Sequence, residues 1–260
     1  FSCLDKKSLL NCTLVCQKWN FIIGSSAQTM KNFTLNLDST KIDLIDRDFR
    51  SQRKHINVHI HLEKEFEKGF DMLKQFDVSQ TRRISIHRYQ DSLGIETLSR
   101  IISRMRLLED ASLILNKVEV KGKTKVKMLN LPKFKRIRLY PVTSNALKLF
   151  NPKQVEEMRI EESPVDDDIK KLLSFMKNAE KLKILRVNKS TFKAIFKQER
   201  KFSFQLTAID MLYLRSALSA EVGENFNKFL LTQPNIKVLN LNGLENIPDA
   251  VHRTILNRLK

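Results

Sequence analysis

The sequence predicts an α/β array of repeated strand–helix pairs, with parallel strands on a concave face and helices on a convex face. The first observation behind this prediction is a triplet of one apolar residue, any residue and a second apolar residue. It occurs nine times, and its first members are Leu35, Val58, Ile84, Leu113, Ile137, Met158, Leu185, Ile209 and Leu239. The second observation is that successive triplets lie 21 to 30 residues apart, which is the length of one strand plus one helix. One such repeat cannot bury its own apolar face, but stacked repeats form a continuous core.

Residues 1–30 have a different pattern and predict a separate helical segment. Their apolar residues recur at steps of three and four, as on one face of an α-helix: Leu9, Cys12, Cys16, Trp19 and Ile23. Asp5 stands where an N-cap is expected. We therefore expect domains at 1–30 and 31–260, the second an array of about nine irregular repeats.

The first repeats predict strands at 33–37 and 56–62 and around Ile84. Helices are expected between them, on two sets of apolar residues: Phe66, Phe70 and Leu73, then Ile95, Leu98, Ile102 and Met105. From Lys117 to Met128, after the strand around Leu113, lysines alternate with apolar residues about Gly122. This segment indicates an extended hairpin or an irregular insert instead of a repeat helix.

The later repeats fit one template, because a further apolar residue lies three positions before each of five triplets: Phe134, Val155, Leu182, Leu206 and Ile236. Pro132 and Pro234 stand where they would end a preceding helix. Two intervening helices are expected, on Ile169, Leu172, Leu173 and Met176, and on Val222, Phe226, Phe229 and Leu230.

The N-terminal segment resembles the second half of an F-box motif. The resemblance rests on a Leu-Asp turn, a Ser-Leu-Leu helix start and a Val-Cys-x-x-Trp element, formed by Leu4, Asp5, Ser8, Leu9, Leu10, Val15, Cys16 and Trp19. It implies contacts with a Skp-family adaptor through Leu4, Leu9, Leu10, Val15 and Trp19. The Leu-Pro dipeptide of the family's opening half is absent here, so the motif is expected to begin upstream of Phe1.

The array is similar to the leucine-rich repeats that often follow an F-box. The resemblance implies an α/β leucine-rich-repeat solenoid preceded by a partial α-helical F-box. One feature departs from the family. The Asn or Cys that many such repeats carry three residues beyond the second strand leucine is absent, and Thr40, Ser163 and Ser190 are the nearest substitutes. We therefore expect repeats of irregular length and curvature.

The charge of the chain is strongly positive, +18 overall, and residues 51–130 carry +6 and residues 131–200 carry +8 of it. Such a field attracts phosphate or an acidic protein surface. The alternative interpretation is a lysine-rich solvated surface. No apolar run approaches the roughly 18 residues that cross a membrane. The three cysteines have no metal-ligand spacing and are expected to be free thiols, as in a cytoplasmic or nuclear protein.

The central residue of each triplet is expected to point outward, because the apolar residues on either side point inward. In three consecutive repeats this residue is an arginine: Arg138, Arg159 and Arg186. Such a stripe suits carboxylate or phosphate capture, although polar residues at wet positions would give the same pattern. We name these arginines, and less strongly Tyr140, His59 and His61, as candidate target contacts.

His59 and His61 could offer two imidazoles on one strand face, with His55 and His87 nearby. Because no Cys, Asp or Glu is placed beside them, solvated histidines are expected, with no metal and no cofactor. The carboxylates of Asp166, Asp167 and Asp168 fit a helix start. The sequence offers neither a glycine-rich phosphate loop nor a recognisable nucleophile–base pair, so we expect no catalytic site.

The resemblance implies the substrate receptor of an SCF-type cullin–RING ubiquitin ligase, a non-catalytic subunit that holds a target protein near the transferring enzyme. Its partners would be a Skp-family adaptor, cullin through that adaptor, and an unidentified target. An alternative is a basic repeat module that binds nucleic acid or an acidic partner without ligase function. A third is an assembly scaffold whose adaptor site is degenerate.

Overall fold

The structure is a computed structural model of the 260-residue chain. It describes residues 4–13, 18–19, 22–23, 26, 30, 34–38, 56–61, 76–120, 126–140, 144–162, 166–212, 216–217, 219–241, 244–245 and 247–258. The chain divides into two compact units, unit 1 from Phe1 to Phe134 and unit 2 from Lys135 to Lys260. Each unit is described by itself.

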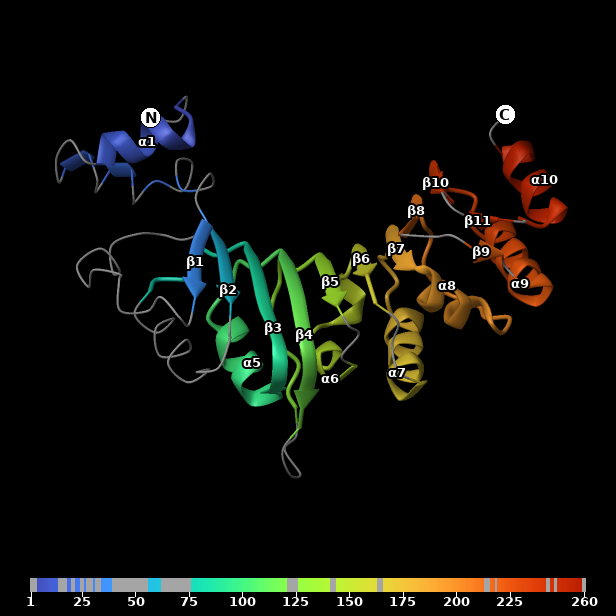
Figure 1. The fold of residues 1–260 in the computed structure, drawn as a ribbon, viewed down its shortest axis with the longest axis horizontal. Helices are drawn as coiled ribbons and strands as arrows, with labels where there is room; N and C mark the ends of the chain where they lie inside the picture. Colours follow the sequence, from blue (N-terminus) through green and yellow to red (C-terminus); the bar gives the residue numbers. More distant parts are fainter. Residues whose placement is uncertain are drawn as a thin grey trace. The chain divides into compact units, whose positions relative to one another are not determined.

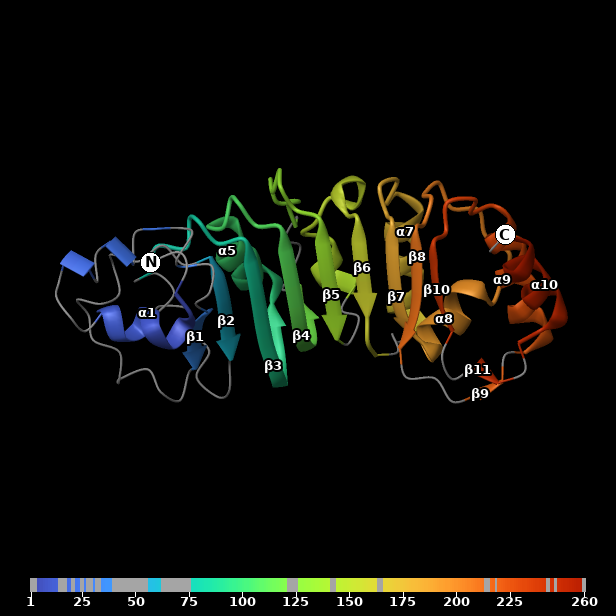
Figure 2. The ribbon, with the colours of Figure 1, turned by 90° about the horizontal axis from the view of Figure 1, so that it is seen from above.

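Unit 1 combines a four-stranded parallel sheet with helices (Figure 1). Its elements are α1 (Lys6–Thr13), β1 (Thr34–Asp38), β2 (Asn57–His61), β3 (Arg83–Gly94), α5 (Ile95–Ser103) and β4 (Asp110–Glu119). The strands pair in chain order, β1-β2-β3-β4. Figure 2 shows α5 behind these strands. A parallel sheet with a helical crossover from β3 to β4 places unit 1 in the α/β class.

Unit 2 repeats this arrangement with five parallel strands in the order β5-β6-β7-β8-β10 and a second, two-stranded sheet of β9 and β11. Its strands are β5 (Arg136–Tyr140), β6 (Glu157–Ile160), β7 (Ile184–Asn188), β8 (Ala208–Leu212), β9 (Ser216–Ala217), β10 (Val238–Asn240) and β11 (Leu244–Glu245). Its helices are α6 (Ser144–Leu147), the 3-10 turn η3 (Pro152–Gln154), α7 (Asp166–Lys177), α8 (Lys189–Phe196), α9 (Ala220–Leu231) and α10 (Asp249–Arg258). Figure 2 shows α7 behind the strands of unit 2.

The strand prediction is confirmed, because each of the nine triplets begins within a strand of one of these parallel sheets. The register of β4 differs from the prediction by two residues. Ala111 lies beside Ile84 and Ser112 beside Ser85, whereas Ile114 lies beside His87. The triplet that matches its neighbour is therefore Ala111–Ser112–Leu113. The small Ala111 is fully buried, but its size makes it a weak apolar signal in the sequence.

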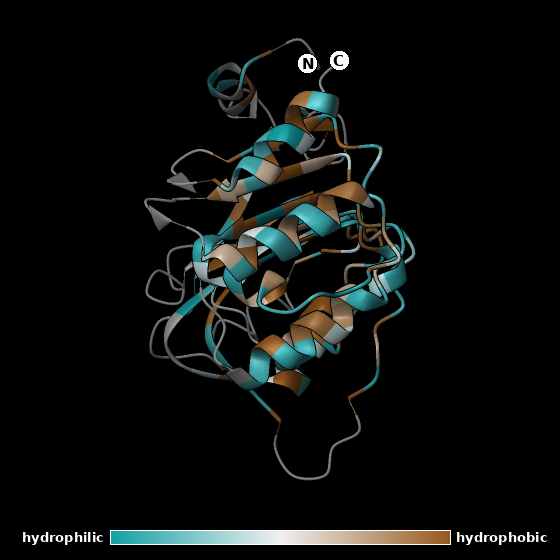
Figure 3. Ribbon diagram, turned by 90° about the vertical axis from the view of Figure 1, so that its right-hand side faces the viewer, coloured by the Kyte–Doolittle hydropathy of each residue, from teal (hydrophilic) through white to brown (hydrophobic). Residues whose placement is uncertain are grey.

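The inward face of each sheet forms the core of its unit. Buried and partly exposed residues alternate strictly along β2, β5, β7 and β8, as expected for strands with one face covered. The predicted helices on Ile169–Met176 and Val222–Leu230 are confirmed as α7 and α9. The helix predicted on Ile95, Leu98, Ile102 and Met105 is confirmed as α5 for the first three residues, whereas Met105 lies beyond the end of α5 at Ser103. Figure 3 shows hydrophobic and hydrophilic residues mixed along the helices. The helix expected on Phe66, Phe70 and Leu73 lies outside the described residues.

Two local predictions need correction. Lys117–Glu119, expected to open an extended hairpin or an irregular insert, instead continues β4 in parallel with Ser92–Gly94 of β3, beyond an irregularity in register. Residues 126–130 have no regular secondary structure, as an irregular insert would have, and residues 121–125 lie outside the described part of the chain. Pro132 lies in a turn, and the described residues just before it, 126–131, are not helical, so it ends no described helix. Pro234 does follow a helix, because α9 ends at Leu231. The sequence pattern also missed α8 and α10.

A repeated backbone hydrogen bond marks the start of the repeats. Two successive N–H groups at a strand entry donate to one carbonyl at the entry of the preceding strand. In unit 1, Arg82 and Arg83 donate to the Ile56 carbonyl; in unit 2, Lys183 and Ile184 donate to the Glu156 carbonyl. Two successive N–H groups donate in the same way to four further backbone carbonyls, those of Arg82, Lys135, Lys183 and Thr207. Because this contact uses only backbone atoms, it tolerates the irregular sequence of the repeats.

Side chains in unit 2 supply further links between repeats, although the Asn or Cys that many leucine-rich repeats carry beyond the strand is absent. Asn188 accepts from the Thr191 N–H as the N-cap of α8 and donates through Nδ2 to the Glu161 carbonyl of the preceding repeat. The buried Gln233 accepts from the Leu206 N–H at 2.8 Å and donates to the Phe204 carbonyl. Scattered polar residues thus satisfy buried backbone groups between repeats.

Candidate functional site

The N-terminal helix α1 begins as the sequence predicts. The Ser8 N–H donates to Asp5 Oδ1 at 2.8 Å, and this bond, the largest effect on the group, lowers the pKa of the Asp5 carboxyl. Asp5 is therefore an N-cap. Farther along, residues 18–19 and 22–23 are also helical.

The candidate adaptor residues divide by burial. Leu4 and Trp19 are exposed by 37% and 39%, and the neighbouring Ile22, which the sequence analysis did not single out, by 40%. Leu9 is fully buried, so it is placed to hold α1 in position instead of touching a partner. The Leu10 side chain and Val15 lie outside the described residues. We call Leu4, Trp19 and Ile22 the N-terminal apolar group.

The arginine register is confirmed in unit 2. Arg138 of β5 lies beside Arg159 of β6, and Arg159 lies beside Arg186 of β7. The row continues to Asp210 of β8 and Asn240 of β10. Neighbouring parallel strands are about 4.8 Å apart, so three guanidinium groups occupy a narrow band. We call this the arginine row.

The arginine row is already paired with carboxylates of its own sheet. Glu161, only 11% exposed, binds Arg138 Nη2 at 2.7 Å and also pairs with Arg159 Nε. Arg186 pairs with Glu157 at 3.1 Å and with Asp210 at 3.6 Å. The three arginines and three carboxylates balance in charge. A ligand carboxylate or phosphate would therefore have to displace an internal acid. Tyr140, half-buried at the end of β5, is a neighbour on the same strand face as Arg138.

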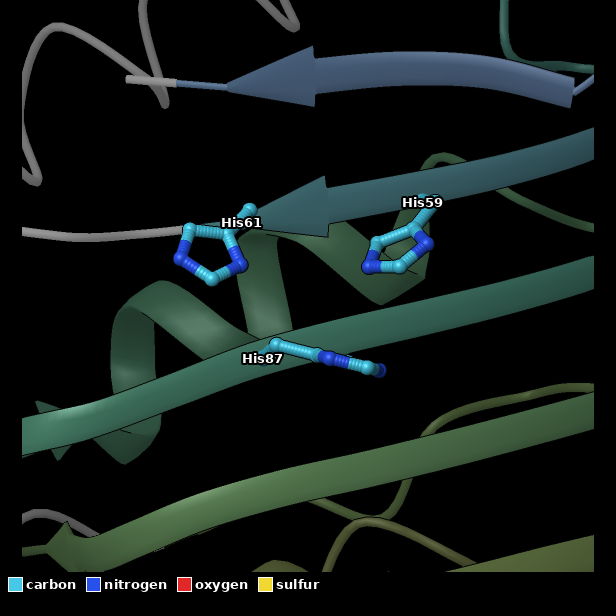
Figure 4. Close-up of side chains that lie close together, drawn as sticks. All are labelled: His59, His61 and His87. Carbon is cyan, nitrogen blue, oxygen red and sulfur yellow. The ribbon is translucent and has the colours of Figure 1, made fainter. Parts of the chain in front are cut away.

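In unit 1 histidines occupy the equivalent strand face, His59 at the central position of its triplet and His61 and His87 two residues beyond that position. His61 of β2 lies beside His87 of β3, and His59 lies beside Ser85. One ring nitrogen from each of His59, His61 and His87 lies within 4.8 Å of the others. Figure 4 shows the three rings gathered over these two strands. We call them the histidine trio.

The trio is partly shielded from solvent. The rings of His59 and His87 lie 4.3 Å apart between centroids, and those of His61 and His87 lie 6.4 Å apart. Ser85 Oγ lies 2.8 Å from His87 Nε2. Burial lowers the pKa of His59, and the charge of His61 lowers it further. The sequence analysis left His87 outside the candidate residues, although the repeat register alone aligned it with His61.

A third feature of possible function lies beside α7 in unit 2. A groove of about 440 Å³ is lined by four exposed basic side chains, Lys170, Lys177, Arg200 and Lys201, together with Leu173, Ser174 and Phe202. None of the described lining residues is acidic. Its charge therefore differs from that of the arginine row, where carboxylates accompany the cations.

Comparison with known protein families and with curated proteins finds no match for this chain. Among the described residues, no helix is both long and apolar enough to cross a membrane.

Proposed function

We propose that this chain is the substrate receptor of an SCF-type ubiquitin ligase, a non-catalytic subunit that binds a Skp-family adaptor through its N-terminal segment. The observation that carries the proposal is the N-terminal apolar group. Leu4, Trp19 and Ile22 expose 37% to 40% of their surface within the segment that resembles an F-box. Large exposed apolar side chains are candidates for contact with a protein partner, and an adaptor helix is the partner that the resemblance implies.

The array that follows suits target recognition. Its strands form a leucine-rich-repeat solenoid in this proposal, and their partly exposed faces present the arginine row and the histidine trio. The pairing of Arg138 and Arg159 with Glu161 favours a target that carries both charges, because an acidic ligand alone would leave Glu161 without a partner. Buried charges that lose their partners cost several kcal/mol. Selection among targets would then come from matching this charge pattern.

The adaptor contact is tested by co-purification of the full-length protein with a Skp-family adaptor. Wild type is compared with Leu4→Asp and Trp19→Ala, each checked for folding by circular dichroism. Met128→Asp is the matched control, because Met128 is also in unit 1 and is 49% exposed. The proposal expects capture by wild type and the control, and loss in the two variants. Failure of wild type, or equal capture by all four proteins, would remove the proposal.

A second candidate function, binding of nucleic acid, is favoured by the basic groove beside α7. Its four cations, accompanied by no acid among the described lining residues, would attract phosphates, and such binding falls steeply with salt. The double variant Lys170→Gln, Lys201→Gln should then bind single-stranded RNA more weakly than the control Lys148→Gln, Lys237→Gln, whose lysines are exposed elsewhere in unit 2. Fluorescence anisotropy across a salt series measures both. Absence of binding by wild type at low salt would exclude this function.

A further inference from the structure

We propose that His59, His61 and His87 form a binding site for a divalent transition metal, with zinc as the best fit. Among the described residues these are the one group of three or more potential ligand side chains that the fold brings together. The inference does not depend on the ligase proposal, because it uses only the geometry of β2 and β3.

The strand pairing supplies the geometry. His59 and His61 are two residues apart on β2, so both side chains point to the same face, and His87 is opposite His61 on β3. The candidate nitrogens lie within 4.8 Å of one another. Tetrahedral zinc with Zn–N bonds of about 2.0–2.1 Å needs nitrogens about 3.3 Å apart. Side-chain rotations can close this difference without moving the strands.

The backbone beneath the trio is fixed by packing. Val58 and Ile60, which alternate with the histidines of β2, are each 2% exposed, and Ile86 beside His87 is fully buried. The three imidazoles themselves are only partly buried, so an ion can reach them. Binding by side chains on packed strands loses less conformational freedom than binding by a loop.

Ser85 supplies a supporting contact of the type that metal-ligating histidines use. Such a histidine normally holds its second ring nitrogen with an acceptor, which fixes the tautomer and the ring. Ser85 Oγ lies 2.8 Å from His87 Nε2 and can accept its N–H. His87 would then offer Nδ1 to the metal, and Ser85 would act as a positioning residue.

The ligand set selects the class of metal. Three imidazoles suit zinc, copper or nickel, whereas calcium and magnesium require oxygen ligands. Three protein ligands leave the fourth position of tetrahedral zinc for water or for a side chain of a binding partner. Closed structural zinc sites commonly include cysteine thiolates, and this group of three histidines contains none. The ligand set therefore fits an open site better than a closed structural one.

The proposal is tested by isothermal titration of the untagged full-length protein with zinc chloride. Wild type is expected to bind one equivalent. Each of His59→Gln, His61→Gln and His87→Gln should weaken binding by at least about tenfold, and Ser85→Ala by a smaller factor. His252→Gln is the matched control, because His252 is exposed on α10 in unit 2 and should bind as wild type does.

Two results would overturn the proposal: absence of zinc binding by folded wild type, or equal affinity in all three histidine variants. Should a variant fail to fold, X-ray absorption spectroscopy of zinc-loaded wild type decides the question. Outer-shell scattering from three imidazoles supports the site. Coordination dominated by oxygen or sulfur rejects it.

Discussion

The partly exposed strand faces of the two units carry different chemistry. In unit 1 the histidine trio gathers three imidazoles, and no acid among the described residues belongs to this group. In unit 2 the arginine row is matched by carboxylates, with Glu161 shared between Arg138 and Arg159. The scaffold therefore determines which side chains are neighbours, whereas the identity of those neighbours decides whether a site is available to a ligand.

If the inward faces of the two units are equivalent, truncating a core side chain should destabilise either unit. This substitution has the largest expected effect on the free energy of unfolding. Ile86 of unit 1 is fully buried and Leu185 of unit 2 is 1% exposed. Ile86→Ala and Leu185→Ala should each lower the free energy of unfolding by about 2–5 kcal/mol. Urea denaturation followed by circular dichroism measures both. A cost below about 1 kcal/mol at either site would mean that this unit lacks a packed core.

The outward faces should respond differently when charge is removed. Glu161→Gln leaves Arg138 and Arg159 adjacent without their shared carboxylate and should destabilise the protein by about 1.5–3 kcal/mol, the range for hydrogen bonds to charged groups. Added salt should reduce the difference in unfolding free energy between wild type and Glu161→Gln, because it screens the repulsion between the two arginines. Glu162→Gln is the control, because Glu162 is the next residue and is exposed. Equal unfolding midpoints for the two variants would show that the Glu161 pairs contribute nothing.

The sequence predicted the strands because burial of alternating side chains imposes the apolar triplets that define them. The prediction of register failed at Ala111, where a small side chain is fully buried. The prediction of strand length failed at Lys117–Glu119, where β4 extends beyond its triplet. The arginine row followed from the repeat register. Its neutralisation by Glu157 and Asp210 depended on side-chain conformations that spacing alone does not determine.

Unit 2 is also linked by polar side chains between repeats, and a smaller effect is expected when one is removed. Asn188→Ala deletes both the cap of α8 and the bond to the Glu161 carbonyl. The expected loss is about 1 kcal/mol, typical of an N-cap. Ser190→Ala, at an exposed position two residues later, should change stability little. Chemical denaturation of both variants measures the two stabilities. An Asn188→Ala protein as stable as the control would show that Asn188 does not stabilise the link between the repeats.

The smallest effect concerns Glu156, which joins Lys135 and Lys183 from the strand entries on either side. Burial alone would raise the pKa of Glu156, but the hydrogen bonds and charges of Lys183 and Lys135 outweigh it and lower the pKa below 4.5. The stability that this provides is present above pH 4.5 and is lost as the pH falls through the lowered pKa. Because these ion pairs are largely exposed, their contribution to stability should be less than about 1 kcal/mol.

Lys183→Met should raise the pKa of Glu156, and carboxyl resonances in a nuclear magnetic resonance titration report it directly. Lys181→Met, at a nearby exposed position, serves as the control. A Glu156 titration unchanged by the loss of Lys183 would show that the ion pair is not formed in solution.

The proposal that the chain is a ligase receptor can be tested by ubiquitin transfer in a reconstituted reaction. Adaptor, cullin–RING core, activating and conjugating enzymes, ubiquitin and the full-length protein would be combined without a target. Since a receptor is held beside the transferring enzyme, wild type should acquire ubiquitin on its own lysines only when the adaptor is present. Trp19→Ala should lose the modification, and Met128→Asp should keep it. Transfer that is absent from wild type, or independent of the adaptor, would contradict the account.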